Sequence, residues 1–158
     1  MVRDVYIQPG EIFFGSGAVR LRTLLGSCVS VVLWHDGKRC GGMCHFMLPS
    51  RSGSRISGFD GRYADEAIAI LRREVVASGT RPGEYRTAIY GGGNMFPDGP
   101  APHFDVGGRN VYAAKSLLGQ HGFLVEKEDV GGRGYRRLTL DLRTGQVHCV
   151  QAASGSSD

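Results

Sequence analysis

The chain consists of short apolar runs separated by turn residues, a pattern that favours many strands over long helices. The segment 29–34 is rich in β-branched residues and is therefore predicted to be a strand. An Asp36-Gly37 pair follows, which is typical of a hairpin turn, and 40–48 is the expected returning strand, closed by Pro49. Further strands are expected at 4–8, 20–25, 85–90, 123–129, 135–142 and 146–151, whereas 11–14 is only a short apolar segment that Gly15-Ser16-Gly17 interrupts.

Two segments instead repeat apolar positions at helical spacing. They are 63–78, with Gly79 as a stop signal, and 109–121, which Gly122 follows. Strands and helices do not alternate regularly along the chain. We therefore expect an α+β protein with a layered, β-sandwich-like core flanked by two main helices.

The length of 158 residues and the apolar content of 41% fit one globular domain. We place this domain at 1–152, followed by a polar tail at 153–158 that is expected to be disordered. A loop with three prolines is expected at 96–103. Glycine supplies 25 of the 158 residues, about twice its average share, which indicates many tight turns and close backbone approaches.

The net charge of +4 is small and the arginines are scattered, so no nucleic-acid partner is expected. No apolar run reaches the ~18–20 residues that span a bilayer, so no membrane insertion is expected. The first residues lack the apolar core of a signal peptide. We therefore expect a cytoplasmic protein whose four cysteines stay reduced.

The candidate chemistry lies at the junction of two predicted strands. Cys28 follows a Gly26-Ser27 turn, and His45 comes seventeen residues later in the next apolar run. If the two runs are neighbouring strands, the Cys28 thiol and the His45 imidazole can face each other, which is the minimum equipment of a cysteine nucleophile. The sharp turn at Gly26 and Ser27 would leave backbone N–H groups near Ser27 and Cys28 to hold an oxyanion.

Other interpretations of these residues remain open. Most cysteines and histidines in apolar runs are core residues. Strand alternation places His45 on the face opposite Cys44, so Cys44 is expected in the core. A metal site could draw on Cys28, Cys40, Cys44, His45, His148 and Cys149, but the spacing matches no zinc motif, and we expect neither metal nor cofactor.

The segment 91–94, Gly-Gly-Gly-Asn, follows a predicted strand but matches no nucleotide-binding motif. We expect it to form a wall of a peptide or side-chain pocket, with Asn94 contacting the substrate.

The segments 25–31 and 41–49 closely resemble the chemoreceptor glutamine deamidase family, CheD. The likeness covers about Val5 to Val150. Shorter matching segments follow in the expected order, at 63–65, 91–96, 107–111, 129–132 and 144–145.

The resemblance implies hydrolysis of glutamine side-chain amides on bacterial chemoreceptors to glutamates, with release of ammonia. It assigns the nucleophile to Cys28 and the base to His45. The family's third group is a threonine six residues before the cysteine, where this chain has Arg22; Thr23 lies five before. Strand alternation would turn Thr23 to the opposite face unless the turn at Gly26 shifts the register. A backbone carbonyl is the alternative orienting group.

The same resemblance implies a fold similar to cysteine-dependent deamidating toxins. It also implies chemoreceptor cytoplasmic helices as partners and a CheC-type phosphatase as a further one. Two other functions stay open: a non-catalytic chemotaxis adaptor, and a thiol hydrolase that acts on a different amide or ester.

Overall fold

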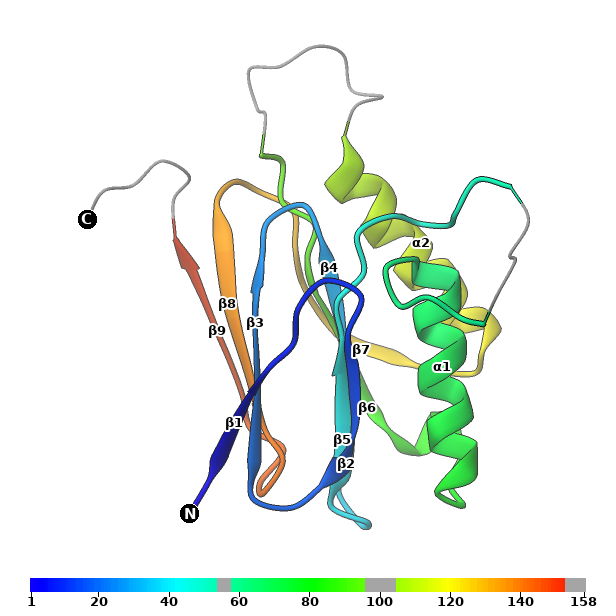
Figure 1. Cartoon of the computed structure of the whole chain (residues 1–158), viewed down its shortest axis with the longest axis vertical. Coiled ribbons are helices and arrows are strands. Elements are labelled where there is room, and N and C mark those ends of the chain that lie inside the picture. Colours follow the sequence, from blue (N-terminus) through cyan, green and yellow to red (C-terminus); the bar gives the residue numbers. More distant parts are fainter. Residues whose placement is uncertain (54–57, 96–104, 153–158) are drawn as a thin grey trace.

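Two β-sheets lie face to face, and two helices cover the outer face of the larger sheet (Figure 1). This computed structural model describes residues 1–53, 58–95 and 105–152; the expected loop at 96–103 and the tail at 153–158 lie outside them. The elements are β1 (Arg3–Tyr6), β2 (Ile12–Ser16), β3 (Val19–Leu25), β4 (Val29–His35), β5 (Cys40–Cys44), α1 (Ala64–Ala77), the 3₁₀ turn η1 (Pro82–Glu84), β6 (Arg86–Gly91), α2 (Val106–Gln120), β7 (Val125–Val130), β8 (Tyr135–Asp141) and β9 (Val147–Ala152).

The smaller sheet has the order β1-β3-β8-β9, and the larger has the order β2-β5-β4-β6-β7. The pairs β1–β3 and β6–β7 are parallel, and the other neighbours are antiparallel. Among the described residues, no helix is long and apolar enough to cross a membrane. The expected α+β class, with a layered β core and two main helices, is confirmed.

The larger sheet is buried on both faces, which explains the unbroken apolar run of β4. Val29, Val31 and Leu33 point into the core between this sheet and the helices. Val32 and Trp34 point the other way, into the core between the two sheets. The alternate side chains of β4 therefore pack in two different cores, one between the larger sheet and the helices and one between the two sheets.

The returning strand is shorter than expected. β5 ends at Cys44, and the chain beyond it forms only isolated bridges, Phe46 with Val29 and Leu48 with Tyr63. The prediction of a strand over 40–48 is wrong at its end because the chain turns there toward α1, where the Leu48 carbonyl accepts from the Ala64 N–H. The other predicted strands differ from their expected ranges by at most two residues at either end, and β2 was not predicted as a strand.

Helix α2 begins three residues before its predicted start. Asp105 caps it, because its carboxylate accepts a hydrogen bond from the Gly108 N–H at 2.9 Å. The two glycines of this first turn weaken the helical signal in the sequence. Gly107 is required by close packing: a Cβ there would lie 2.4 Å from the Gly92 carbonyl oxygen.

Replacing Gly107 with alanine should force the start of α2 away from the Gly91–Gly93 loop and lower the free energy of unfolding by about 1–3 kcal/mol. The matched control is Gly119→Ala on the same helix, where a Cβ would meet no atom within 4 Å. That variant should be neutral or up to about 1 kcal/mol more stable, because alanine favours the helix. Urea denaturation of both variants measures the difference. Equal stability of the two would contradict the packing argument.

Candidate functional site

Cys28 lies at the corner between β3 and β4, where the chain leaves one sheet and enters the other. Figure 1 shows this connection at the upper end of the molecule. Two glycines brace this corner from the loop after β6. The Gly93 N–H donates to the Gly26 carbonyl at 2.9 Å, and the Gly92 N–H donates to the Cys28 carbonyl at 2.8 Å. The corner is therefore fixed by backbone contacts that leave the thiol half-buried.

His45 lies one residue beyond β5, on the same face as Cys28. Val29 and Phe46 exchange two backbone hydrogen bonds of 3.1 and 3.0 Å, which places Ser30 opposite His45. Cys28 and His45 are then diagonal neighbours across the two chains, both on the sandwich side. Within the described residues the thiol forms no hydrogen bond, a common state of catalytic pairs before substrate binds.

A hydroxyl from the opposite sheet holds the His45 ring. Thr23 Oγ1 lies 2.7 Å from His45 Nδ1 and donates its own hydrogen to the Ile7 carbonyl at 2.7 Å. Because that hydroxyl has one hydrogen, Nδ1 must be the donor to Thr23 Oγ1. The second ring nitrogen, Nε2, is then left as a proton acceptor.

Strand alternation does not turn Thr23 away from the site, because the exception allowed for a change at the Gly26 turn applies. On β3, Thr23 points inward with Leu21 and Leu25, whereas Arg22 points outward and lies 3.2 Å from Asp4. Alternation on β3 does not predict the side on which Cys28 lies, because Cys28 follows the corner and belongs to the other sheet. The threonine five residues before the cysteine thus reaches His45.

Burial sets the charges of the two candidate groups. It raises the pKa of the Cys28 thiol and lowers the pKa of His45, which the nearby Ile7 carbonyl partly offsets. The resting pair at neutral pH is therefore a thiol and a neutral imidazole. Such a pair acts by transferring the thiol proton to the ring as the nucleophile attacks.

The expected role of backbone N–H groups at Ser27 and Cys28 as oxyanion donors stays a prediction. Neither the Ser27 N–H nor the Cys28 N–H donates to any of the residues that the structure describes. Asn94 is exposed on the loop after β6, where its N–H donates to the Gly132 carbonyl at 2.8 Å. Its contact with a substrate stays a prediction.

One buried residue near the corner was missed by sequence reasoning. Asn110 on α2 has an exposed fraction of 0%, and its side-chain amide donates to the Ser27 carbonyl at 3.1 Å. A single asparagine after two glycines gives no sequence signal of such a contact.

Exposed apolar side chains surround the corner. Met47 is 40% exposed and lies opposite Cys28 in the strand register. The Tyr135 ring lies 3.3 Å from the Cβ position of Gly26, and Leu24 is 55% exposed at the end of β3. This rim can receive an apolar face of a macromolecular substrate.

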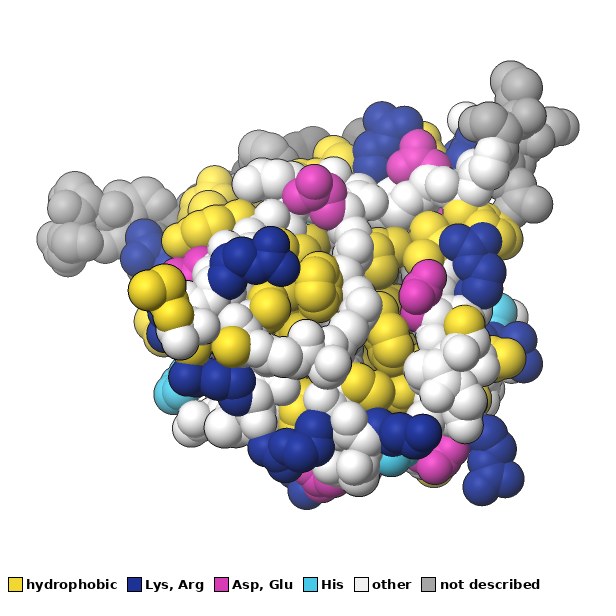
Figure 2. All heavy atoms as spheres, turned by 60° about the horizontal axis from the view of Figure 1, so that its bottom comes forward, with side chains coloured by type: hydrophobic (Ala, Val, Ile, Leu, Met, Phe, Trp, Pro, Cys, Tyr) yellow, Lys and Arg dark blue, Asp and Glu magenta, His cyan; other side chains and the backbone are white. Residues whose placement is uncertain are grey.

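A cavity of about 270 Å³ lies elsewhere, lined in part by Trp34, Arg86 and Val147. None of the predicted site residues lines it. Figure 2 shows the lower end of the molecule, where hydrophobic side chains lie exposed between the layers and Lys and Arg surround them. The candidate chemistry lies apart from this cavity, at the end of the sandwich where β3 leads into β4.

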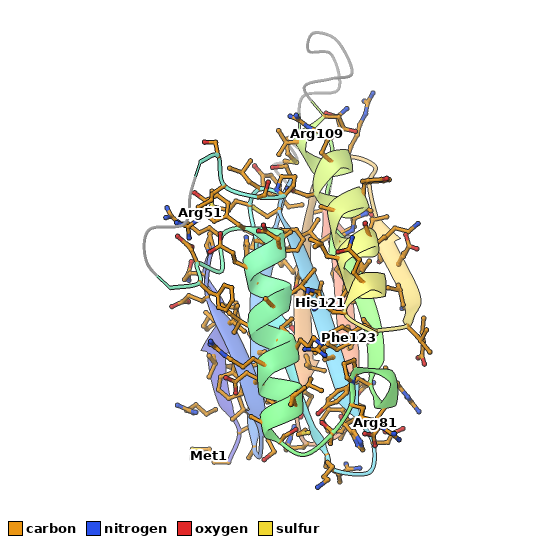
Figure 3. The ribbon with its side chains drawn as sticks, turned by 90° about the vertical axis from the view of Figure 1, so that its right-hand side faces the viewer. Met1, Arg51, Arg81, Arg109, His121 and Phe123 are labelled. Atoms are coloured by element: carbon orange, nitrogen blue, oxygen red, sulfur yellow. The ribbon has the colours of Figure 1, made fainter. Side chains whose placement is uncertain are left out.

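Basic side chains lie near the upper end of the helical face, where Figure 3 labels Arg51 and Arg109. Arg51 forms a 2.7 Å ion pair with the buried carboxylate of Glu66. Arg109 is exposed near the start of α2 and pairs with no acidic group of the described residues. Arg109 is thus an available positive charge beside the site.

The residues considered for a metal site lie apart. Cys44 is in the core between sheet and helices, where burial raises its pKa to about 12, whereas His45 faces the other sheet. In the ranges that the structure describes, no three His, Cys, Asp or Glu side chains lie close enough to share a metal ion.

Residues 47–151 match the family model described as CheD chemotactic sensory transduction. This match begins after Cys28 and His45, so it does not include them. The chain is 47% identical over 148 residues to a probable chemoreceptor glutamine deamidase CheD of Pseudomonas savastanoi pv. phaseolicola, an alignment of 92% of this chain and 83% of that protein.

Two further similar proteins carry the same description. The chain is 43% identical to the probable chemoreceptor glutamine deamidase CheD 3 of Dechloromonas aromatica, over 92% of this chain and 86% of that protein. It is 34% identical to the probable chemoreceptor glutamine deamidase CheD 1 of Leptospira interrogans, over 93% and 92% respectively.

The half-buried Cys28 thiol should react slowly with iodoacetamide at pH 7 and faster as pH rises. The midpoint of the rate against pH should lie above the ordinary cysteine pKa of about 8.5. Cys44 should stay unmodified in the folded protein because it is fully buried. Peptide mapping after timed alkylation measures both rates. A Cys28 midpoint well below pH 8 would indicate a thiolate ion pair instead.

Proposed function

The chain belongs to the CheD family, and on this premise we propose that it is a protein-glutamine deamidase that converts glutamines of chemoreceptors to glutamates. The observation that carries the proposal is the arrangement of Cys28 and His45 on one face, with His45 held by Thr23 in a proton-accepting tautomer. The deamidase domain is assigned to 1–152. A likeness in fold to cysteine-dependent deamidating toxins is part of the same proposal.

The first half of the reaction forms a thioester. His45 Nε2 takes the Cys28 thiol proton as the sulfur attacks the amide carbon of a receptor glutamine. The N–H groups of Ser27 and Cys28 bind the oxyanion of the tetrahedral intermediate. The imidazolium then gives its proton to the amide nitrogen, the C–N bond breaks, and ammonia leaves.

The second half releases the product. His45 takes a proton from water, whose oxygen attacks the thioester carbon, and the C–S bond breaks when the proton returns to the sulfur. The products are a glutamate side chain and the regenerated thiol. One negative charge is added to the receptor for each event.

Thr23 holds the ring throughout this cycle. Its hydroxyl accepts from Nδ1–H while donating to the Ile7 carbonyl, so the imidazolium formed during attack keeps a fixed acceptor. The ring then needs no rotation between its two proton transfers. Thr23 thus completes the catalytic group of Cys28 and His45 as a positioning residue.

The substrate is proposed to be a chemoreceptor cytoplasmic helix in the cytoplasm. The half-buried Cys28 thiol at the end of the sandwich can be reached by a glutamine that projects from a helix, and the exposed Met47, Leu24 and Tyr135 can contact the apolar face of that helix. Catalysis on a large partner does not need a deep pocket. A CheC-type phosphatase is a further proposed partner.

The competing function is an adaptor that binds receptors or a CheC-type phosphatase without catalysis. A binding surface would not need a buried imidazole held in one tautomer by a hydroxyl from another sheet. The Thr23–His45 contact therefore favours the enzyme.

Incubation of the protein with receptor cytoplasmic fragments should raise the fragment mass by about one unit for each modified glutamine. Cys28→Ala should abolish this gain while keeping the fold, because the nucleophile is lost. Intact-mass spectrometry with circular dichroism checks both results. Unchanged mass together with co-elution of the two proteins would support the adaptor, and full activity of Cys28→Ala would exclude the thiol mechanism.

Thr23→Val should lower kcat by about 10- to 100-fold, because the ring loses the acceptor that orients it. It should also cost about 1–3 kcal/mol of stability, since a buried Ile7 carbonyl and an imidazole N–H lose their partner. Thr23→Ser should keep most of the activity. The control is Arg22→Ala, one residue away on the outer face, which should leave kcat unchanged in the same ammonia-release assay. A larger loss of kcat in Arg22→Ala than in Thr23→Val would assign the role of positioning His45 to residue 22 instead.

A further inference from the structure

Asn110 contacts both segments that carry the candidate chemistry. Its Nδ2 donates to the Ser27 carbonyl at 3.1 Å and to the Met47 carbonyl at 2.9 Å. Ser27 directly precedes Cys28, and Met47 lies two residues after His45. One side-chain amide thus links the corner to the segment beyond β5.

The orientation of this amide is unambiguous. Rotating it by half a turn would place Oδ1 against two carbonyl oxygens, so the two N–H bonds must point at them. Oδ1 itself is buried and accepts no hydrogen bond from the described residues. A buried acceptor without a partner costs free energy, which the two donated hydrogen bonds offset.

The contact with Ser27 fixes the peptide group that joins Ser27 to Cys28. In a trans peptide the carbonyl and the N–H point in opposite directions. Asn110 holds the carbonyl toward α2, which packs on the helix side of the larger sheet. The Cys28 N–H is therefore turned to the other side, where His45 lies.

The neighbouring carbonyls are held in the same way. Gly93 binds the Gly26 carbonyl and Gly92 binds the Cys28 carbonyl, so three consecutive carbonyls of the corner accept hydrogen bonds. The Ser27 and Cys28 N–H groups donate to none of the described residues. Asn110 is the one side chain in this set, and hence the part that a substitution can remove.

We propose that Asn110 is a positioning residue that aims the Cys28 N–H at the oxyanion and fixes the distance between the Cys28 corner and the His45 segment. This inference rests on the proposed deamidase function. Asn110 itself touches no reacting atom; it acts through the Ser27–Cys28 peptide.

The test compares Asn110→Ala and Asn110→Ser with wild type, counting active sites by alkylation of Cys28 and confirming folding by circular dichroism below the melting temperature. Asn110→Ala should lower kcat on a receptor fragment by about 10²-fold, as loss of an oxyanion donor does, with KM within about 3-fold. Asn110→Ser keeps one donor and should recover part of that loss.

Two readouts separate positioning from general damage. The pH profile of Cys28 alkylation should not change, because alkylation forms no oxyanion. Inhibition by a glutamine-analogue peptide aldehyde, whose thiohemiacetal oxygen would sit at the oxyanion position, should weaken by about the same factor as kcat. The matched control is Ala114→Gly, a buried position one turn further along α2, which should lose stability but keep its kcat for each reactive thiol.

A kcat in both Asn110 variants equal to that of wild type, or a loss matched by Ala114→Gly, would overturn the inference. Failure of the proposed function looks different: wild type itself would leave the receptor fragment unchanged. If the peptide aldehyde then still bound more weakly to the Asn110 variants than to wild type, the positioning role of Asn110 would hold, and the protein would be a thiol hydrolase with a different substrate.

Discussion

The hydrogen bond between Thr23 and His45 joins the two sheets at the point where chemistry is proposed. Thr23 lies on the inner face of β3, and His45 follows β5 in the other sheet. A displacement of one sheet against the other would break this 2.7 Å contact and release the ring. The geometry of the site therefore depends on the packing of the whole sandwich.

The corner around Cys28 depends on glycine for a different reason. Gly92 has a φ of +67°, and its Cβ position lies 2.4 Å from Val111 and 2.9 Å from the Gly107 carbonyl. Only residues without a side chain let the loop after β6 lie between the corner and α2. The clusters of glycine in the sequence thus mark places where backbone supports backbone, next to the thiol.

The sequence was sufficient to predict the class of fold, the number of main helices and the pairing of the segments that carry Cys28 and His45. These rest on local periodicity, which the structure follows closely. The alternation of side chains along a strand did not predict the orientation of Thr23 relative to Cys28, because a corner separates the two residues. No local sequence pattern shows where a chain passes from one sheet to the other. Asn110 could not be predicted at all, since its contacts to Ser27 and Met47 span 83 and 63 residues.

The burial of the Cys28 thiol also governs how it meets oxidants. Peroxide reacts with the thiolate, and a raised pKa keeps the sulfur protonated at neutral pH. A half-buried, protonated sulfur of this kind is less prone to conversion to sulfenic acid than a thiolate. In the proposed mechanism the sulfur becomes reactive when His45 takes its proton during attack, so the nucleophile would be preserved between encounters with the substrate.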